Sequence, residues 1–117
     1  MTIDKMIVYC RVDEFEQCEE FAEQVLQLKL WKKKEHCNIY LLNEQIGLAY
    51  CRAGSEDTYS EGILISWVTD QVDDWYRKFN DHKFAITEPK KNEKYNIYHF
   101  FGSDPAGNTF ELMKFLD

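Results

Sequence analysis

Apolar residues follow two spacings along the chain, and the spacing changes at an acidic residue in each half. Residues 6–12 are a strand-like apolar run that ends at Asp13, and residues 63–69 are a second run that ends at Asp70. Beyond each aspartate, apolar residues recur every three or four positions, as in a helix with one packed face. They are Phe15, Cys18, Phe21, Ala22, Val25 and Leu26 in the first half, and Val72, Trp75, Tyr76 and Phe79 in the second. The pattern predicts two strand–helix units, with Asp13 and Asp70 as N-caps.

More strand-like runs follow each predicted helix. In the first half they are residues 37–42 and 46–51. In the second half they are an aromatic run at 95–103 and a run at 109–115, with a short strand expected near 84–87. The second half therefore has the order βαβββ, and the half-length repeat predicts the same order for the first half.

This order predicts a single domain of class α+β, made of two βαβββ modules at about residues 1–56 and 57–117. Each module leaves one sheet face uncovered by its own helix. Two modules side by side would form one curved mixed sheet around a cleft, with the helices outside. The alternative is an unrelated α+β sandwich such as a ferredoxin-like domain, which has fewer strands between its helices.

The last two runs are joined by a turn with specific chemistry. Asp104 can bond to the backbone ahead of it, Pro105 has the φ of a type I turn, and Gly107 can take the left-handed conformation. In the outgoing strand, Glu111 lies between two apolar residues. If those neighbours pack into a core, Glu111 points the opposite way together with Met113.

This terminal stretch closely resembles the end of proteins in the vicinal oxygen chelate superfamily, which includes glyoxalase I, extradiol dioxygenases and the fosfomycin- and bleomycin-resistance proteins. The matching residues are Phe101, Asp104, Pro105, Gly107, Asn108, Phe110, Glu111 and Leu112. The half-length repeat extends the resemblance over nearly the whole chain. It implies the two-module sheet described above.

The resemblance also implies where a metal-dependent member would carry its ligands. Those positions hold Met6 or Ile7 in the first strand and Ile63 or Leu64 in the second half, and residues 46–52 contain no carboxylate. Only Glu111 matches a ligand position, whereas a catalytic metal needs about three protein ligands.

The resemblance therefore points to metal-free members that resemble bleomycin-resistance proteins, with no cofactor. Such a protein binds a small molecule in the cleft, and it usually forms a homodimer. Two alternatives stay open. One is a lyase, isomerase or dioxygenase with a metal held by a partner chain or by His99 and Glu111. The other is a structural or regulatory dimer without a ligand.

The residues expected to face the cleft alternate along their strands. They are Ile7, Tyr9, Arg11, Ile63, Ile65, Trp67, Thr69, Glu111 and Met113. The predicted ligand-binding set is Tyr9, Arg11, Tyr50, Trp67, Tyr98, His99, Glu111 and Met113. Tyr9 and Trp67 would stack on a partly aromatic or cationic ligand, with Arg11 and Glu111 as polar contacts. Alternatively the aromatic residues fill the sheet interior, Arg11 and Glu111 form a structural ion pair, or a one-residue slip exchanges the two faces.

Among the three histidines, His99 lies in a strand expected beside that of Glu111. The two form an acid–base pair if they share a face, or a cross-strand polar pair without catalysis. His36 and His82 are expected in solvent. The basic runs 32–34 and 90–94 are expected in exposed loops, and the second of these would border the cleft.

Charge and composition exclude several other classes. A net charge of −7 opposes binding to nucleic acid, and there is no apolar run long enough to span a membrane. The N-terminus has no signal-peptide pattern. The four cysteines, Cys10, Cys18, Cys37 and Cys51, include no Cys-x-x-Cys pair. They are expected to be reduced and buried in a cytoplasmic protein.

Overall fold

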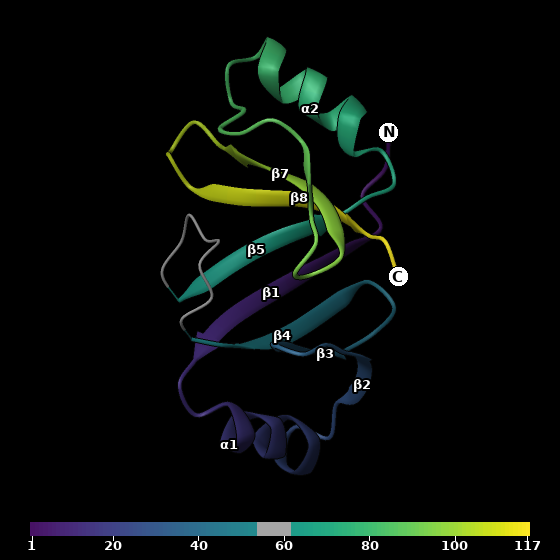
Figure 1. Cartoon of the computed structure of the whole chain (residues 1–117), viewed down its shortest axis with the longest axis vertical. Helices are drawn as coiled ribbons and strands as arrows, with labels where there is room; N and C mark the ends of the chain where they lie inside the picture. The colour runs from purple at the N-terminus through teal and green to yellow at the C-terminus, as the bar shows by residue number, and fades with distance from the viewer. Residues whose placement is uncertain (54–61) are drawn as a thin grey trace. The chain divides into compact units, whose positions relative to one another are not determined.

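The computed structural model describes residues 1–53 and 62–117 (Figure 1). The first half contains β1 (Lys5–Val12), α1 (Phe15–Glu20), a π-helical turn η1 (Phe21–Val25), β2 (Lys29–Lys33), β3 (Cys37–Leu41) and β4 (Ile46–Arg52). The second half contains β5 (Ile63–Val68), α2 (Val72–Asp81), β6 (Lys90–Asn92), β7 (Ile97–Ser103) and β8 (Thr109–Phe115). The βαβββ order predicted for each half is confirmed.

The eight strands are hydrogen-bonded in the order β2-β3-β4-β1-β5-β8-β7-β6. The sheet is mixed, because β5 and β8 are parallel whereas β7 and β8 are antiparallel. The chain divides into two compact units: a C-terminal unit of Met1–Met6 with Ile65–Asp117, and an N-terminal unit of Ile7–Leu64. The expected module boundary at residues 56 and 57 lies outside the described residues.

In the N-terminal unit, the helical segment packs on the face of β3 and β4 that carries the even-numbered residues. The Asn38 amide donates a hydrogen bond to Glu19, and the Tyr40 hydroxyl donates one to Glu23 at 2.9 Å. The opposite face is apolar and contains the buried Ile39. Burial and the neighbouring Glu23 raise the pKa of Tyr40, so its phenol stays neutral and continues to donate.

The predicted helix caps are wrong. Glu14 and Gln71 occupy the N-cap positions, and neither uses its side chain to bond the first turn. Just before the second helix, Thr69 Oγ1 accepts a hydrogen bond from the N–H of the N-cap residue Gln71 at 3.1 Å, which orders the entry to the helix without capping its first turn. The helix starts were therefore located correctly while the capping residues were not.

Two cysteines contradict the prediction of four reduced thiols. Cys37 and Cys51 face each other in the β3–β4 register, with their Cα atoms 4.1 Å apart, and form a disulfide. Cys10 and Cys18 are free. The hairpin explains the pairing, since Cys37 and Cys51 each lie seven residues from Glu44 in the turn (44 − 37 and 51 − 44).

The two lysine-rich segments, 32–34 and 90–94, lie partly in strands and not wholly in the expected loops. Lys32 and Lys33 belong to β2 and pair with β3, and Lys90 begins β6, which pairs with β7. The strand expected near residues 84–87 is reduced to a single bridge between Ala85 and Gly102. Both β2 and β6 end the strand order, where lysine protects an edge strand from further pairing.

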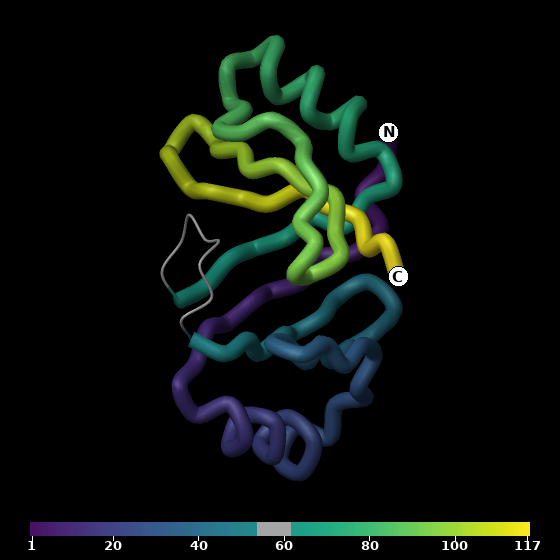
Figure 2. The backbone as a smooth tube through the Cα atoms, in the orientation of Figure 1, coloured from purple at the N-terminus to yellow at the C-terminus, as the bar shows by residue number. Residues whose placement is uncertain are grey.

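In the C-terminal unit, α2 lies beside the β7–β8 hairpin (Figure 2). Its core is formed by Val72, Phe100 and Leu112, with Trp67, Trp75, Tyr76, Phe79 and Tyr98 packed around it. The approach is close at Gly102, where an added Cβ would lie 2.6 Å from Cδ2 of Phe79. Phe79 of α2 therefore packs directly against the β7 backbone, with no room for a side chain at residue 102.

The turn between β7 and β8 has the predicted chemistry. The Asp104 carboxylate accepts hydrogen bonds from the N–H groups of Ala106 at 3.0 Å and Asn108 at 2.9 Å. Gly107 has a φ of 87°, in the left-handed region. This turn fixes the register in which β8 presents Glu111. None of the helices within the described residues has the length and apolar character needed to cross a membrane.

Candidate functional site

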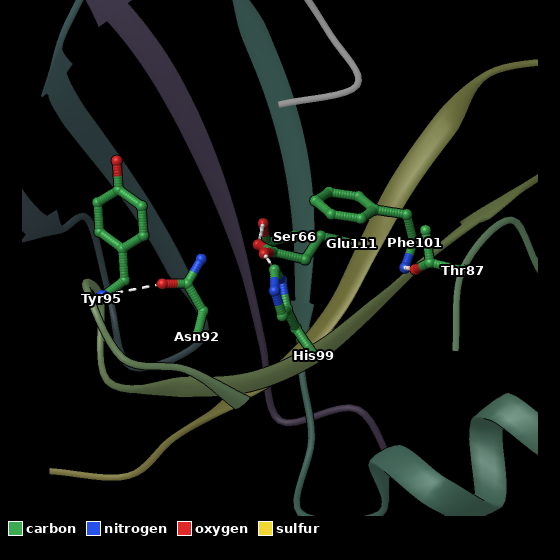
Figure 3. Close-up of polar contacts among 7 residues, drawn as sticks. All are labelled: Ser66, Thr87, Asn92, Tyr95, His99, Phe101 and Glu111. Carbon is green, nitrogen blue, oxygen red and sulfur yellow. Dashed lines mark hydrogen bonds and ion pairs between the residues drawn. The ribbon is translucent and has the colours of Figure 1, made fainter. Parts of the chain in front are cut away.

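Three polar side chains meet on the face of β5, β7 and β8 that lies opposite α2 (Figure 3). They are Ser66, His99 and Glu111, which are 0%, 2% and 5% exposed. Ser66 and Glu111 are register partners in the parallel β5–β8 pair, and His99 is the partner of Met113 in the β7–β8 pair. All three residues belong to the C-terminal unit.

Glu111 is bonded through both of its oxygens. Ser66 Oγ donates to Glu111 Oε1 at 2.5 Å, and His99 Nδ1 lies 2.6 Å from Glu111 Oε2. An ionised carboxylate can only accept hydrogen bonds, so with Glu111 ionised the proton resides on Nδ1. The carboxylate then fixes both the tautomer and the orientation of the ring.

The other ring nitrogen, His99 Nε2, is buried and has no hydrogen-bond partner among the residues described. An unsatisfied polar atom in a protein interior is costly and often marks a functional group. In the tautomer fixed by Glu111, Nε2 carries a lone pair. It can accept a hydrogen bond or a proton from a bound molecule.

The surroundings of His99 are largely aromatic and apolar. The Phe101 ring meets the imidazole edge-on, with the ring centroids 5.2 Å apart. The backbone N–H of Phe101 donates a hydrogen bond to Thr87 Oγ1 at 2.9 Å. Met113 is fully buried. Asn92 stabilises the turn before β7 by accepting a hydrogen bond from the Tyr95 N–H at 3.3 Å (Figure 3).

The cluster differs from a nucleophilic triad. In such a triad the histidine bonds to the serine and removes its proton, whereas here Ser66 bonds to the carboxylate. Ser66 is consequently a positioning group for Glu111 and not an activated nucleophile. The chemistry available is hydrogen bonding and proton transfer at His99.

Of the predicted ligand-binding residues, the structure brings His99, Glu111 and Met113 together on one face. The prediction that Trp67 shares this face is wrong. Trp67 packs against the α2 core and lies 5.7 Å from the Phe110 ring, centroid to centroid. The β5 assignment slipped by one residue, so the face predicted for Ile63, Ile65, Trp67 and Thr69 is opposite to that of Ser66.

Tyr98 also lies on the helix side. Its hydroxyl donates a hydrogen bond to Asp73 at the start of α2, with a distance of 2.5 Å. This bond is the main cause that raises the pKa of Tyr98. A neighbour of His99 in sequence is thus on the opposite face of the same strand.

The other predicted residues belong to the N-terminal unit. Tyr50 is the register partner of Asn38, whose amide bonds to Glu19 in α1, so Tyr50 lies on the α1 side. Burial, together with the neighbouring Cys18 and Cys10, raises the pKa of Tyr50. Tyr9 and Arg11 flank Cys10 in β1, and their side chains therefore project from the other face of that strand. The Arg11–Glu111 ion pair stays a prediction.

The remaining histidines lie away from this cluster. His82 is exposed as expected, whereas His36 is half-buried and lies 3.9 Å from a Glu35 carboxylate oxygen. Ser66 was missed in the sequence because of the strand slip. Its signal was a single hydroxyl within the otherwise apolar run of β5.

The donor set does not fit a divalent metal. Within residues 1–53 and 62–117, no group of three or more His, Cys, Asp or Glu side chains is placed to hold an ion. Both oxygens of Glu111 are already bonded to Ser66 and His99. Leu64, which shares the strand face of Ser66, offers no donor atom.

The family model of the Glyoxalase/Bleomycin resistance protein/Dioxygenase superfamily matches residues 6–112. No curated protein sequence matches the chain. Among solved structures, the NAD-dependent benzaldehyde dehydrogenase from Legionella pneumophila aligns with a TM-score of 0.77 at 18% identity, covering 94% of this chain and 98% of that one.

A superfamily member from Vibrio splendidus 12B01 aligns with a TM-score of 0.68 at 12% identity, covering 97% of this chain and 99% of that one. A variant of Streptomyces coelicolor methylmalonyl-CoA epimerase in complex with 2-nitronate-propionyl-CoA aligns with a TM-score of 0.72 at 16% identity, covering 98% of this chain and 94% of that one. At these identities the likeness establishes the fold alone.

Proposed function

Because the chain belongs to the Glyoxalase/Bleomycin resistance protein/Dioxygenase superfamily, we propose that it is a metal-independent small-molecule-binding protein whose ligand bonds to His99. The observation that carries this proposal is the buried Nε2 of His99, which has no partner among the described residues. A bound molecule would satisfy that atom, which the described residues leave unpaired at a cost.

The surroundings of Nε2 support binding. Small-molecule sites combine mostly apolar walls with a few fixed polar groups. Phe101 and Met113 supply apolar surface beside His99, and Glu111 holds the imidazole in place. This combination suits a ligand with an apolar or aromatic frame and one polar group.

The proposal is tested by observing the histidine ring nitrogens by NMR during titration with a ligand panel. The panel contains bleomycin, phenols, aromatic amines and acyl-CoA thioesters. A ligand at the proposed site shifts the His99 signals and leaves those of His36 and His82 unchanged, and His99→Gln abolishes its binding. If no compound shifts His99, or if all three histidines respond alike, the proposal fails.

A second candidate is an enzyme that removes a proton from carbon, with His99 as the general base. The lone pair on Nε2 and the carboxylate on Nδ1 have the arrangement that such a base needs. Methylmalonyl-CoA epimerase has a similar fold and suggests methylmalonyl-CoA as a first substrate. Deuterium incorporation from D₂O that disappears in His99→Gln would support this candidate. No incorporation by the wild-type protein would dismiss it for that substrate.

We also propose a homodimer, on the basis of the resemblance alone. Sedimentation equilibrium tests it directly, and a monomer at all concentrations would contradict it. A cytoplasmic location was inferred from four reduced cysteines, and the Cys37–Cys51 disulfide removes that support, because such bonds are rare in the cytosol.

A further inference from the structure

We infer that the outer side of the helical segment formed by α1 and η1 is a docking surface for a basic, partly apolar segment of another protein. The surface consists of the exposed side chains of Phe21, Val25 and Leu26, here called the apolar patch, and of the glutamates beside them. These residues all belong to the N-terminal unit, whereas His99 belongs to the C-terminal unit. The docking surface and the proposed ligand site are therefore made of different residues.

The helical segment directs a carboxylate toward the sheet and apolar groups toward solvent. Glu23 accepts a hydrogen bond from the buried Tyr40 hydroxyl at 2.9 Å. Phe21 and Val25, which the apolar spacing of the sequence predicts on the packed face, are both exposed. A helix that only covers a sheet turns its apolar stripe inward. Packing against the sheet therefore does not account for these two side chains.

The backbone of η1 brings the members of the apolar patch together. The Leu26 N–H donates to the Phe21 carbonyl oxygen, five residues back, at 3.0 Å. In an α-helix, with 3.6 residues per turn, Leu26 would point well away from the side that carries Phe21. The wider π-helical turn moves Leu26 toward Phe21 and Val25. Such turns are rare and are frequent at functional sites.

Neighbouring apolar side chains on a surface differ in meaning from isolated ones. Single exposed apolar residues are normal, whereas a contiguous patch with a polar rim marks an interaction site. Phe21, Val25 and Leu26 are 43%, 66% and 43% exposed. Glu20 and Gln24, which are also exposed, supply polar neighbours in the same segment. The apolar patch thus has the composition of a protein interface.

The charge of the same segment identifies the kind of partner. Residues 15–25 contain no lysine, arginine or histidine and four glutamates, Glu16, Glu19, Glu20 and Glu23. The last turns of α1 and η1 have no basic residue, although the carboxyl end of a helix favours positive charge. Arg52 pairs with Glu16, whereas Glu23 bonds to a neutral phenol. A basic partner would supply the missing positive charge.

Other occupants match the surface less well. Two copies of the chain that met through this surface would bring their glutamates together, and like charges oppose such an interface. Each copy also has a net charge of −7. A membrane with anionic lipids would be repelled for the same reason. A segment with apolar side chains between its lysines or arginines matches both the apolar patch and the glutamates.

The test uses the whole protein and three fluorescently labelled peptides. The first has leucine and lysine at the spacing of an amphipathic helix, the second has glutamate in place of lysine, and the third has serine in place of leucine. Binding is measured by fluorescence anisotropy, and the site is located from amide NMR signals. We expect the leucine–lysine peptide to bind at α1 and η1, about tenfold or more tightly than either of the others.

Two double variants test the apolar patch. Phe21→Gln with Val25→Gln changes only exposed side chains and should weaken binding of the leucine–lysine peptide about tenfold or more. Ile86→Gln with Leu116→Gln changes two exposed apolar residues of the C-terminal unit and should leave binding unchanged. Because the three peptides are compared on the wild-type protein, their order of affinity does not depend on the folding of a variant.

A further pair of variants tests the charge. Glu20→Lys reverses an exposed charge next to the apolar patch and should weaken binding of the leucine–lysine peptide several-fold. Glu93→Lys makes the same change at an exposed position of the C-terminal unit and should have little effect. Added salt should also weaken the binding.

Several results would overturn the inference. Equal binding to the wild-type protein and to Phe21→Gln with Val25→Gln would exclude the apolar patch from the interface. A leucine–glutamate or serine–lysine peptide that bound as tightly as the leucine–lysine peptide would refute the basic or the apolar character of the partner. A dimer in sedimentation that only the Phe21→Gln, Val25→Gln variant disrupts would identify a second copy as the occupant. No binding of the leucine–lysine peptide up to its solubility limit would also refute it.

Discussion

Glu111 is the residue on which the candidate site depends most directly. One buried carboxylate accepts hydrogen bonds from two buried donors, Ser66 and His99, and so satisfies both of them. Its own charge is compensated by the same bonds. A change at this position should therefore affect folding stability as well as ligand binding.

Replacing Glu111 by Gln should lower the free energy of unfolding by about 1–3 kcal/mol, because the amide cannot accept from both neighbours. Denaturant unfolding measures this change. Glu93→Gln, an exposed change of the same type in the turn before β7, serves as the matched control and should have almost no effect. Equal stability of the two variants would show that the Glu111 bonds contribute nothing.

Asp104 gives a pH prediction at the other end of the same hairpin. Hydrogen bonds from the Asn108 side chain and backbone hold the pKa of Asp104 below its usual value. A depressed pKa in the folded state stabilises the fold above the ordinary aspartate pKa, and this contribution is lost as the pH falls through the folded value. Asn108→Ala should raise the pKa of Asp104 in a carboxyl NMR titration. An unchanged titration would refute the assigned cause.

Among the helices, strands and turns, those with a distinctive local residue pattern were predicted correctly from the sequence. The β7–β8 turn was predicted correctly because Asp104 and Gly107 have well-defined roles in such turns. The two helices were located by the spacing of their apolar residues. The edge strands β2 and β6 were missed because their lysines hide the alternation of a strand.

The orientation of β5 was not predictable from pattern alone. Ile63, Leu64 and Ile65 are consecutive apolar residues, so neither face of the strand is distinguished by polarity. Trp67 was consequently assigned to the face that Ser66 occupies. The register with β8, which only the fold supplies, resolves this ambiguity.

The packing of α2 on β7 predicts a cost for Gly102→Ala. The new Cβ would lie 2.6 Å from Phe79 Cδ2 and 3.2 Å from the Phe84 carbonyl oxygen, which forces helix and strand apart. We expect a loss of about 1–3 kcal/mol in unfolding free energy.

Gly107→Ala is the matched control, since no atom lies within 4 Å of its added Cβ and only its φ of 87° opposes the change. It should cost about 1–2 kcal/mol. In a double-mutant cycle, Phe79→Leu should recover part of the Gly102→Ala loss and none of the Gly107→Ala loss. Additive effects in both pairs would contradict the close contact.

The Cys37–Cys51 bond predicts the result of thiol counting. The unfolded protein should react at two thiols, Cys10 and Cys18, before reduction and at all four cysteines after it. The double change Cys37→Ala with Cys51→Ala should lower stability by about 3 kcal/mol, as expected for closing a loop of this length. Four reactive thiols in the freshly purified, unreduced protein would refute the bond.

For the whole molecule, the chain belongs to the family, while the described residues contain no group of three or more His, Cys, Asp or Glu side chains placed to hold an ion. Glu111, which the resemblance predicts at a ligand position, instead bonds to His99 and orients its ring. The chain has a net charge of −7, so its acidic surface can attract cations weakly. A test for a metal site must therefore separate this surface binding from binding at Glu111.

The most direct test of metal independence is calorimetric titration of chelator-treated, tag-free protein with Zn²⁺, Ni²⁺, Mn²⁺ and anaerobic Fe²⁺. We expect only weak binding without defined stoichiometry in the wild-type protein, and the same weak binding in Glu111→Gln and Glu93→Gln. Tight one-to-one binding of any of these ions that is lost in Glu111→Gln and kept in Glu93→Gln would contradict it.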